Sequence, residues 1–284
     1  MYQTHFGLRE LPFGLPPDTM FAYTSTSHQE ALNTLLIAAK TGEGFIKITG
    51  EVGTGKTLLC RSFLGALDPA FVSAYIPNPY LQPRALLCAV AEELGVLPHR
   101  HGWHDVMKAL TQALLEFAAA GQSVVICLDE AQAMPKESLE ALRLLTNLET
   151  EKRRLLQIVL FGQPELDVLL AQESLRQLRQ RITFQYRLRA LEREEIASYL
   201  THRLRAAGYR GPGMFDRAAI RVLHRASKGV PRLVNIVAHK AMLLAYGEGL
   251  QQVSARHVRA AVSDTPAAKQ SRWSWLRLVH GRAT

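Results

Sequence analysis

The chain has 284 residues, of which 48% are hydrophobic and 21% charged, and this balance excludes an intrinsically disordered or low-complexity protein. The 34 Lys and Arg residues exceed the 25 Asp and Glu residues and give a formal net charge of +9, which permits nucleic acid, an anionic membrane or an acidic protein as a partner and selects none of them. The sequence has no run of 18 apolar residues and no secretory signal, so we expect a cytoplasmic protein without a transmembrane segment. The 3 cysteines are far apart, which indicates neither a disulfide framework nor a zinc site.

The length favours two domains, and an irregular segment precedes the first of them. Residues 1–26 are rich in Pro, Gly and aromatic residues, which predicts a strap lying over a domain and neither a helix nor a strand. Ser27 and Glu30 then have the spacing of a capping box, and one apolar helical face follows. A first helix is therefore expected from this box to Gly42.

Short apolar runs alternate with helical patterns through residues 27–190. The runs predict strands at 45–49, 71–76, 124–128 and 155–161. Helices are predicted near 55–67, 82–95, 104–120 and 137–149. Such alternation is typical of a doubly wound, mostly parallel sheet with helices on both faces, so an α/β domain is expected over 27–190.

After about residue 190 the patterns are helical throughout, which predicts a small helical domain over 191–263. The tail, 264–284, contains no acid after Pro266 and brings Trp273 and Trp275 close to several Lys and Arg residues. Two interpretations stay open for this tail. It is a mobile terminus, or it docks on a membrane surface or in a partner's groove.

The phosphate-loop pattern is the strongest chemical signal in the sequence. It consists of Gly50, Glu51, Val52, Gly53, Thr54, Gly55, Lys56 and Thr57, between a predicted strand and a predicted helix. Glycines let the backbone wrap a polyphosphate, Lys56 is expected to reach the β- and γ-phosphates, and the Thr57 hydroxyl is expected to hold Mg²⁺. The sequence therefore predicts a site for ATP and Mg²⁺.

Polar side chains follow the strands at 124–128 and 155–161. Asp129 and Glu130 end the first of these strands, where the ligand crevice of a doubly wound sheet lies. We expect Asp129 to support Mg²⁺ and Glu130 to polarise the attacking water. Gln163, after the next strand, is expected to touch the γ-phosphate or that water, or else to cap the turn that follows.

Two arginines complete the candidate site. Arg181, in an Arg-rich stretch, is the candidate for an arginine supplied to a neighbouring subunit, and a basic patch for nucleic acid is the second interpretation of that stretch. Arg232 opens a helix after Gly229 and is interpreted as a sensor of the γ-phosphate. The cluster of His99, His101 and His104 contains no acid or cysteine, so a surface loop is favoured over a metal site.

Together these motifs resemble those of AAA+ ATPases, and more narrowly the ExeA/GspA group of secretion-pathway ATPases. The matching segments are Phe6–Leu8 with Pro12–Phe13, Gly50–Thr57, Asp129–Gln132, Leu144–Glu149, Gly162–Leu166, Leu178–Ile182 and Gly229–Asn235. The resemblance implies a P-loop AAA+ core with a C-terminal helical lid.

The resemblance also implies roles for individual residues. Lys56 and Thr57 would bind nucleotide and Mg²⁺, and Asp129 and Glu130 would form the Walker B pair. Gln163 would be sensor 1, Arg181 would be the arginine finger and Arg232 would be sensor 2. ExeA-type proteins continue into a transmembrane helix and a peptidoglycan-binding domain, so we expect this chain neither to anchor itself in the membrane nor to grip the cell wall.

The function that the sequence favours is that of a Mg²⁺-dependent ATPase, peripheral at the inner membrane. It would form a ring or another homo-oligomer and support a type IV pilus of the mannose-sensitive haemagglutinin (MSHA) type or a related secretion machine. The alternative is a DNA-associated AAA+ ATPase of the TniB-like transposition-helper type. A small-molecule kinase is disfavoured, because it needs only the phosphate loop and leaves Arg181 and Arg232 without a role.

Overall fold

The computed structural model describes residues 2–15, 19–96, 102–147 and 154–270, and the chain divides into two compact units. The helical unit comprises Met1–Ser25, Val52–Gly55 and Arg189–Thr284, and the sheet unit comprises Thr26–Glu51 and Lys56–Leu188. Each unit has its own apolar core.

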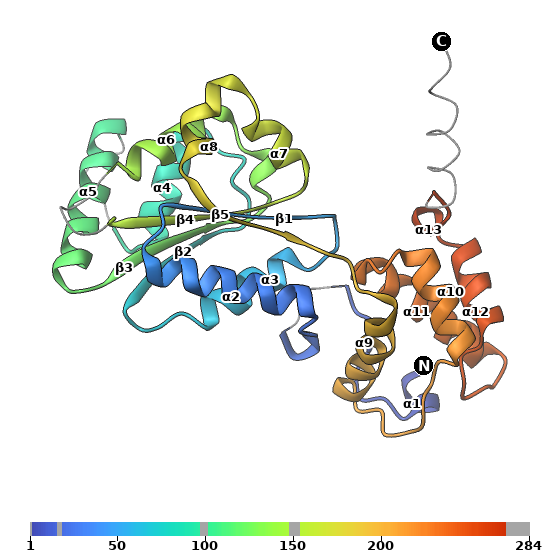
Figure 1. Cartoon of the computed structure of the whole chain (residues 1–284). Coiled ribbons are helices and arrows are strands. Elements are labelled where there is room, and N and C mark those ends of the chain that lie inside the picture. Colours follow the sequence, from blue (N-terminus) through green and yellow to red (C-terminus); the bar gives the residue numbers. More distant parts are fainter. Residues whose placement is uncertain (1, 16–18, 97–101, 148–153, 271–284) are drawn as a thin grey trace, which may run out of the picture. The chain divides into compact units, whose positions relative to one another are not determined.

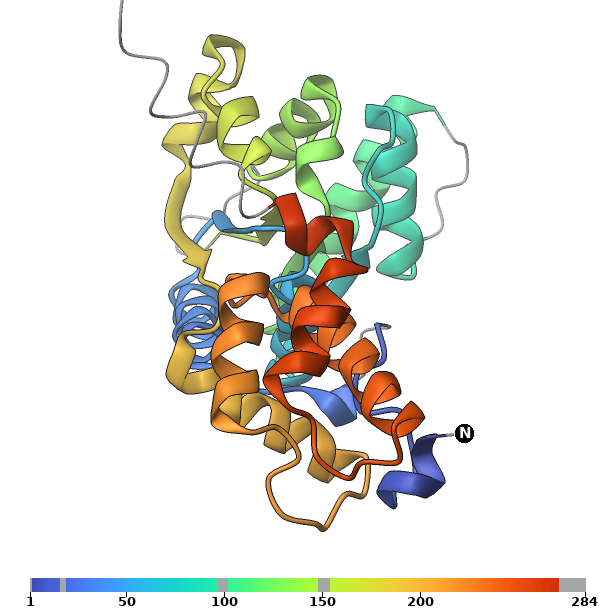
Figure 2. The ribbon, with the colours of Figure 1, turned by 90° about the vertical axis from the view of Figure 1, so that its right-hand side faces the viewer.

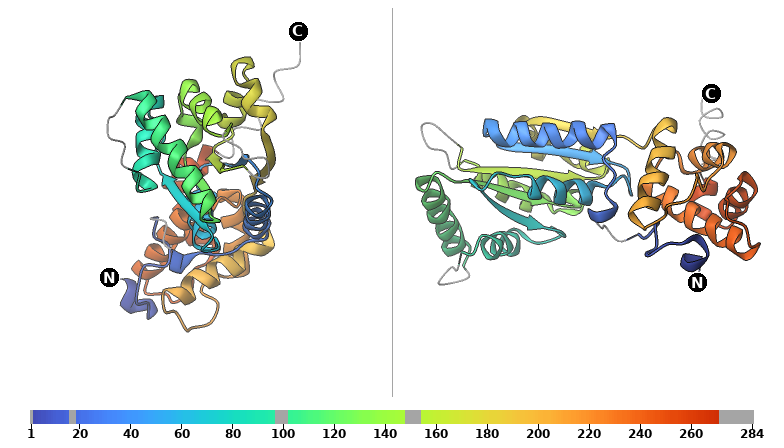
Figure 3. Two further views of the ribbon diagram at one scale, coloured as in Figure 1. Left: turned by 90° about the vertical axis from the view of Figure 1, so that its left-hand side faces the viewer. Right: turned by 90° about the horizontal axis from the view of Figure 1, so that it is seen from below.

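The sheet unit contains a parallel sheet in the order β2-β3-β4-β1-β5, whose strands run side by side in Figure 3. The strands are β1 Phe45–Gly50, β2 Phe71–Ile76, β3 Ser123–Leu128, β4 Leu156–Gly162 and β5 Ile182–Leu188. The first four lie within one residue of the predicted ranges. The prediction of an α/β fold with a mostly parallel sheet is thus confirmed.

Helices cover both faces of this sheet (Figure 1). One face carries α2 Thr26–Thr41 and α3 Lys56–Gly65. The other carries α4 Pro83–Glu93, α5 Trp103–Ala119, α6 Lys136–Leu145, α7 Glu165–Leu170 and α8 Arg176–Gln180, with short 3-10 turns at Ala131–Ala133 and Glu173–Leu175. All seven residues of β4 are buried, because a strand covered on both faces can be apolar throughout.

Strand β5 was not predicted from the sequence. Its residues alternate between half-buried Ile182, Phe184 and Tyr186 and exposed polar positions, and it pairs only with β1 at the edge of the sheet. An edge strand needs no continuous apolar run. The arginines on either side of it made the segment resemble a solvated surface.

Within the described residues the helical unit packs five C-terminal helices around one core, and Figure 2 shows them in gold, orange and red. They are α9 Arg193–Ala206, α10 Arg217–Ser227, α11 Pro231–Gly247, α12 Ala255–Ser263 and α13 Pro266–Gln270. Hence the C-terminal region is helical, as predicted. None of the helices within the described residues has the combined length and apolar character that a bilayer crossing requires.

The N-terminal segment packs on the same helical core. Its aromatic residues Phe6, Phe13 and Phe21 are buried there, and it contains α1 Tyr2–Phe6 and a 3-10 turn at Thr19–Phe21. Buried Arg203 of α9 fixes the segment by donating to the carbonyls of Pro12 (2.6 Å) and Gly14 (3.3 Å). The sequence predicted no helix here, because one helical turn is too short to show a periodic pattern.

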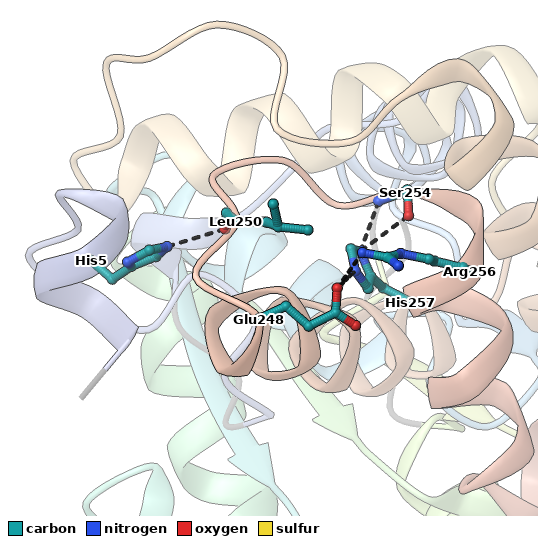
Figure 4. A network of polar contacts seen from close by, with 6 residues as sticks. All are labelled: His5, Glu248, Leu250, Ser254, Arg256 and His257. Atoms are coloured by element: carbon teal, nitrogen blue, oxygen red, sulfur yellow. Dashed lines mark hydrogen bonds and ion pairs between the residues drawn. The ribbon is translucent and has the colours of Figure 1, made fainter.

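Polar contacts fix the turn that joins α11 to α12 (Figure 4). His257, whose exposed fraction is 2%, receives the backbone N–H of Ser254 on Nδ1 and lies 3.1 Å from a Glu248 carboxylate oxygen through Nε2. Arg256 also binds Glu248, and these contacts lower the pKa of that carboxyl group, with His257 as the largest cause. Both ring nitrogens of His257 therefore have polar partners, which explains how this histidine can be buried.

Candidate functional site

The phosphate-loop pattern adopts the expected strand–loop–helix arrangement. Strand β1 ends at Gly50 and helix α3 begins at Lys56. Between them Gly53 and Gly55 have φ angles of 81° and 95°, a left-handed conformation that residues with a Cβ rarely adopt. Only glycine meets this backbone geometry without strain, which explains the two fixed glycines of the loop.

Lys56 is held inside this loop. Its ammonium donates to the carbonyl oxygens of Gly50 (2.8 Å) and Glu51 (3.1 Å), and only 5% of the residue is exposed. Burial lowers the pKa of Lys56, and the carboxylates of Glu130 and Asp129 oppose that shift. An ammonium has three donors, so one is left for an anion such as a phosphate oxygen.

Thr57, which follows Lys56 in the chain, forms a pair of oxygen-bearing side chains with Asp129. The Thr57 hydroxyl donates to Asp129 Oδ2 at 2.5 Å, and only 3% of Asp129 is exposed. Tyr75 also donates to Oδ2 at 3.5 Å, and burial followed by the Asp129 charge raises the pKa of Tyr75 to about 12. Hydroxyl and carboxylate oxygens are the ligands that Mg²⁺ prefers, so this donor set fits that ion.

The described residues contain no cluster of three or more His, Cys, Asp or Glu side chains that could hold a metal by itself. This finding agrees with the way Mg²⁺ is bound in nucleotide sites, where one or two protein oxygens act together with substrate phosphates. His104 lies on α5, whereas His99 and His101 are outside the described residues.

Glu130 follows β3 in a strained backbone conformation. Its φ and ψ angles are 54° and 36°, in the left-handed region that a non-glycine residue enters at an energetic cost. Its carboxylate oxygen Oε2 accepts hydrogen bonds from the side-chain amides of Gln132 (2.6 Å) and Gln163 (3.0 Å). Within the described part of the chain no hydrogen bond or ion pair engages Oε1.

Gln132 is a site residue that the sequence analysis did not single out. Besides its bond to Glu130, its Oε1 accepts the backbone N–H of Gln163 at 2.9 Å, so one amide joins the ends of β3 and β4. Because Gln163 binds Glu130, its amide does not act only as a turn cap. The sequence signal that could have indicated Gln132 is its position two residues after Glu130.

Arg181 lies apart from this group. It stands between α8 and β5, and its guanidinium donates to Thr146 Oγ1 at 3.0 Å. Among the described residues, no hydrogen bond or ion pair joins Arg181 to Lys56, Asp129 or Glu130. The structure therefore does not bring the candidate finger to the phosphate loop of its own sheet unit.

Arg232 and the middle of the phosphate-loop pattern belong to the helical unit. The backbone N–H of Arg232, near the start of α11, donates to Gly53 O at 3.2 Å. A Cβ at Gly53 would lie 2.4 Å from the Arg232 Cβ, so the contact tolerates only glycine. Val52 is exposed, and Thr54 is buried.

The arginines around β5 have partners inside the sheet unit. Arg176 pairs with Glu173 at 3.3 Å, Arg187 with Glu51 at 3.8 Å, and Arg179 donates to a backbone carbonyl. These arginines are exposed, so the interpretation of the stretch as a patch for nucleic acid stays a prediction.

Comparisons with known proteins agree with this fold and site. The AAA domain family matches residues 39–170. General secretion pathway protein A of Aeromonas hydrophila is 43% identical over 255 residues, which cover 89% of this chain and 46% of that protein. The chain thus spans about half the length of this relative. The chain is therefore similar to the AAA domain family over residues 39–170 and to this relative over most of its own length.

Solved structures share the fold at lower identity. The ORC2 protein of Aeropyrum pernix, in ADPNP–ADP complexes, gives a TM-score of 0.59 at 19% identity, covering 86% of this chain and 70% of that one. Cdc6p of Pyrobaculum aerophilum gives 0.63 at 17% identity, covering 87% and 70%. At this identity the likeness shows the P-loop AAA fold alone.

Proposed function

We propose that this chain, which has the P-loop fold of the AAA ATPases, is a Mg²⁺-dependent ATPase of the ExeA/GspA family whose active site is completed by a neighbouring subunit. The observation that carries the proposal is the set of contacts that groups Lys56, Thr57, Asp129 and Glu130 at the ends of β1 and β3. This set contains the cation, the metal oxygens and the base that phosphoryl transfer to water needs.

Each residue has a separate task in this reaction. Gly50–Gly55 would surround the phosphates with backbone N–H groups, and Lys56 would bind the β- and γ-phosphates. Thr57 and Asp129 would hold Mg²⁺, which neutralises charge on the phosphate oxygens. Glu130 would accept a proton from the attacking water through Oε1, while Gln132 and Gln163 hold Oε2.

Arg181 is proposed as the arginine finger that one subunit supplies to the next. The proposal is supported by the hydrogen bond of Arg181 to Thr146, because within the described residues no hydrogen bond or ion pair joins Arg181 to a residue of the candidate site. Arg232 is proposed as the nucleotide sensor of the helical unit. An arginine supplied in trans raises the turnover of comparable sites by about 10³–10⁵-fold and couples hydrolysis to assembly.

Mixing two inactive variants tests this proposal. Arg181→Ala retains an intact phosphate loop, and Glu130→Gln retains an intact finger, so a mixture contains interfaces with both groups in place. We expect each variant alone to lose Mg²⁺-dependent turnover and the equimolar mixture to regain a measurable fraction. A mixture as inactive as its components would contradict a finger supplied between subunits.

The cellular role is proposed from the relative's name. General secretion pathway protein A belongs by name to a secretion pathway, so the nucleotide cycle would serve a secretion machine. The narrower proposal is that the chain, like the pilus-biogenesis protein MshM that it resembles, supports assembly of an MSHA-like type IV pilus and is peripheral at the inner membrane. Co-purification of inner-membrane pilus components with the Glu130→Gln variant is expected. Capture of none of them would contradict the pilus role.

Gln132→Met is expected to lower turnover about 10–100-fold with little change in nucleotide affinity, because an unheld Glu130 no longer presents its carboxylate to water. Gln132→Glu places a like charge beside Glu130 and raises the pKa of that base, so the acid limb of the pH–rate profile moves to higher pH. Steady-state rates from pH 5 to 9 check both. The control is Gln112→Met, because Gln112 is an exposed residue of α5. If the Gln132 variants kept normal turnover and an unchanged pH–rate profile, Gln132 would not belong to the site.

A further inference from the structure

A hollow of about 460 Å³ lies on the surface of the helical unit, and none of the residues that line it is one to which a role in nucleotide chemistry is assigned. Every side chain that lines it is cationic or can be protonated. The lining residues are Arg193 of α9 and Arg221, His224, Arg225 and Lys228 in and after α10. No carboxylate lines it, and neither does any Phe, Tyr, Trp or aliphatic hydrocarbon residue, although the hydrocarbon parts of the basic side chains contribute to its wall.

The positive charge of this basic hollow is not neutralised within the part of the chain that the structure describes. None of its five side chains takes part in a hydrogen bond or an ion pair there. Helix α10 contains no acid, and Asp216, which precedes it, accepts the backbone N–H of Ala219. Beside Arg193, Glu192 and Glu195 form the capping box of α9, and Glu194 is an exposed acid in the same first turn that does not line the hollow. By contrast, Lys240 of the same unit is paired, with Asp264 at 2.7 Å.

Helix stability does not explain the cluster. Cations in the last turn interact favourably with the carbonyl end of a helix, which accounts for His224, Arg225 and Lys228. It does not account for Arg221, which is a full turn earlier, or for Arg193, which comes from another helix. Moreover, Arg221 and Arg225 are four residues apart, a spacing at which like charges repel across one helical turn. The arrangement therefore indicates an anionic ligand.

We propose that the basic hollow binds the phosphate backbone of a nucleic acid, independently of base sequence and of the ATPase site. Guanidinium groups form paired hydrogen bonds with phosphate oxygens, and three of the five lining residues are arginines. Arg221 and Lys228 are seven residues apart, which is about 10 Å along a helix and spans about three phosphates of one strand.

The residues that line the basic hollow also favour a nucleic acid over an acidic protein or an anionic membrane as its ligand. A protein partner is expected to place an apolar or aromatic anchor at the centre of its interface, and a membrane surface is expected to receive apolar side chains. The basic hollow offers neither. Nucleic-acid interfaces, in contrast, are polar and strongly positive.

Fluorescence anisotropy with a labelled 20-base-pair duplex of random sequence tests the proposal on the full chain. The test variant is the double Arg221→Glu, Arg225→Glu, and the matched control is Arg205→Glu, Arg259→Glu, two exposed arginines of the same unit with the same change in charge. We expect the test variant to lose at least about ten-fold in affinity, and the slope of log K against log salt to become shallower by about two. The control is expected to lose much less, and ATP turnover is expected to be unchanged in both.

Three outcomes would overturn the proposal. In the first, the unchanged protein does not bind the duplex. In the second, both double variants lose equal affinity for the duplex, which would assign binding to the overall charge of the protein. In the third, the unchanged protein binds vesicles of phosphatidylglycerol through Arg221 and Arg225 and does not bind the duplex, which would make the ligand a membrane. Because turnover is measured separately, a failure of this site is distinguishable from a failure of the proposed ATPase.

Discussion

Replacing Lys56 with alanine is expected to lower ATP turnover by about 10³-fold and to remove the rise in Tm that ATP gives the unchanged protein. The ammonium lies at the phosphate loop on the carbonyls of Gly50 and Glu51 and is the only buried lysine among the described residues. Burial lowers the pKa of Lys56, so the folded protein holds this charge at a cost, and we expect its removal to leave the unliganded protein folded. Turnover and ligand-dependent Tm, measured on the same sample, separate lost binding from lost folding.

The matched control is Lys108→Ala, because Lys108 is exposed on α5 and has no place in the site. It is expected to hydrolyse ATP and to respond to ATP as the unchanged protein does. If Lys56→Ala kept its turnover, or lost no more than the control, the assignment of the phosphate loop would be wrong.

Glu130→Gln is expected to lower turnover by about 10²–10⁴-fold while ATP binding is retained. Glutamine has nearly the same shape and accepts the same left-handed backbone, but its neutral amide cannot take a proton from water. The variant should therefore accumulate bound ATP, which single-turnover measurements and the nucleotide content of the purified protein reveal.

Glu137→Gln is the control for this change, since Glu137 is an exposed residue in the first turn of α6. Turnover at the level of the control in Glu130→Gln would assign the base to another residue. Loss of both turnover and ATP binding would instead give Glu130 a role in holding the nucleotide.

The sequence predicted the interior of the sheet unit better than its edge. Strands β1, β3 and β4 are covered on both faces, so each is a short apolar run bounded by turn residues. Strand β5 is half exposed, and its alternating polar positions, among them the exposed Arg187, hid it as a strand. In the structure Arg187 pairs with Glu51, which begins the phosphate loop.

The candidate site was predictable where a motif fixes neighbours along the chain and less so where tertiary contacts decide. The strand–loop–helix pattern indicates that Lys56 and Thr57 lie at a helix start, and the parallel sheet brings Asp129 to Thr57. No local pattern gives the bridge from Gln132 to Gln163, because it depends on which strands are neighbours. The contact of Arg181 with Thr146, 35 residues away, is hidden from the sequence for the same reason.

ATP turnover per chain, measured across a series of protein concentrations with Mg²⁺ at near-physiological salt, tests the central claim most directly. The account predicts that turnover per chain rises with concentration, because each site needs Arg181 of a neighbouring subunit, and that Arg181→Ala abolishes the rise. Constant turnover per chain over the whole series, or a series that the Arg181→Ala variant reproduces, would contradict an active site completed between subunits.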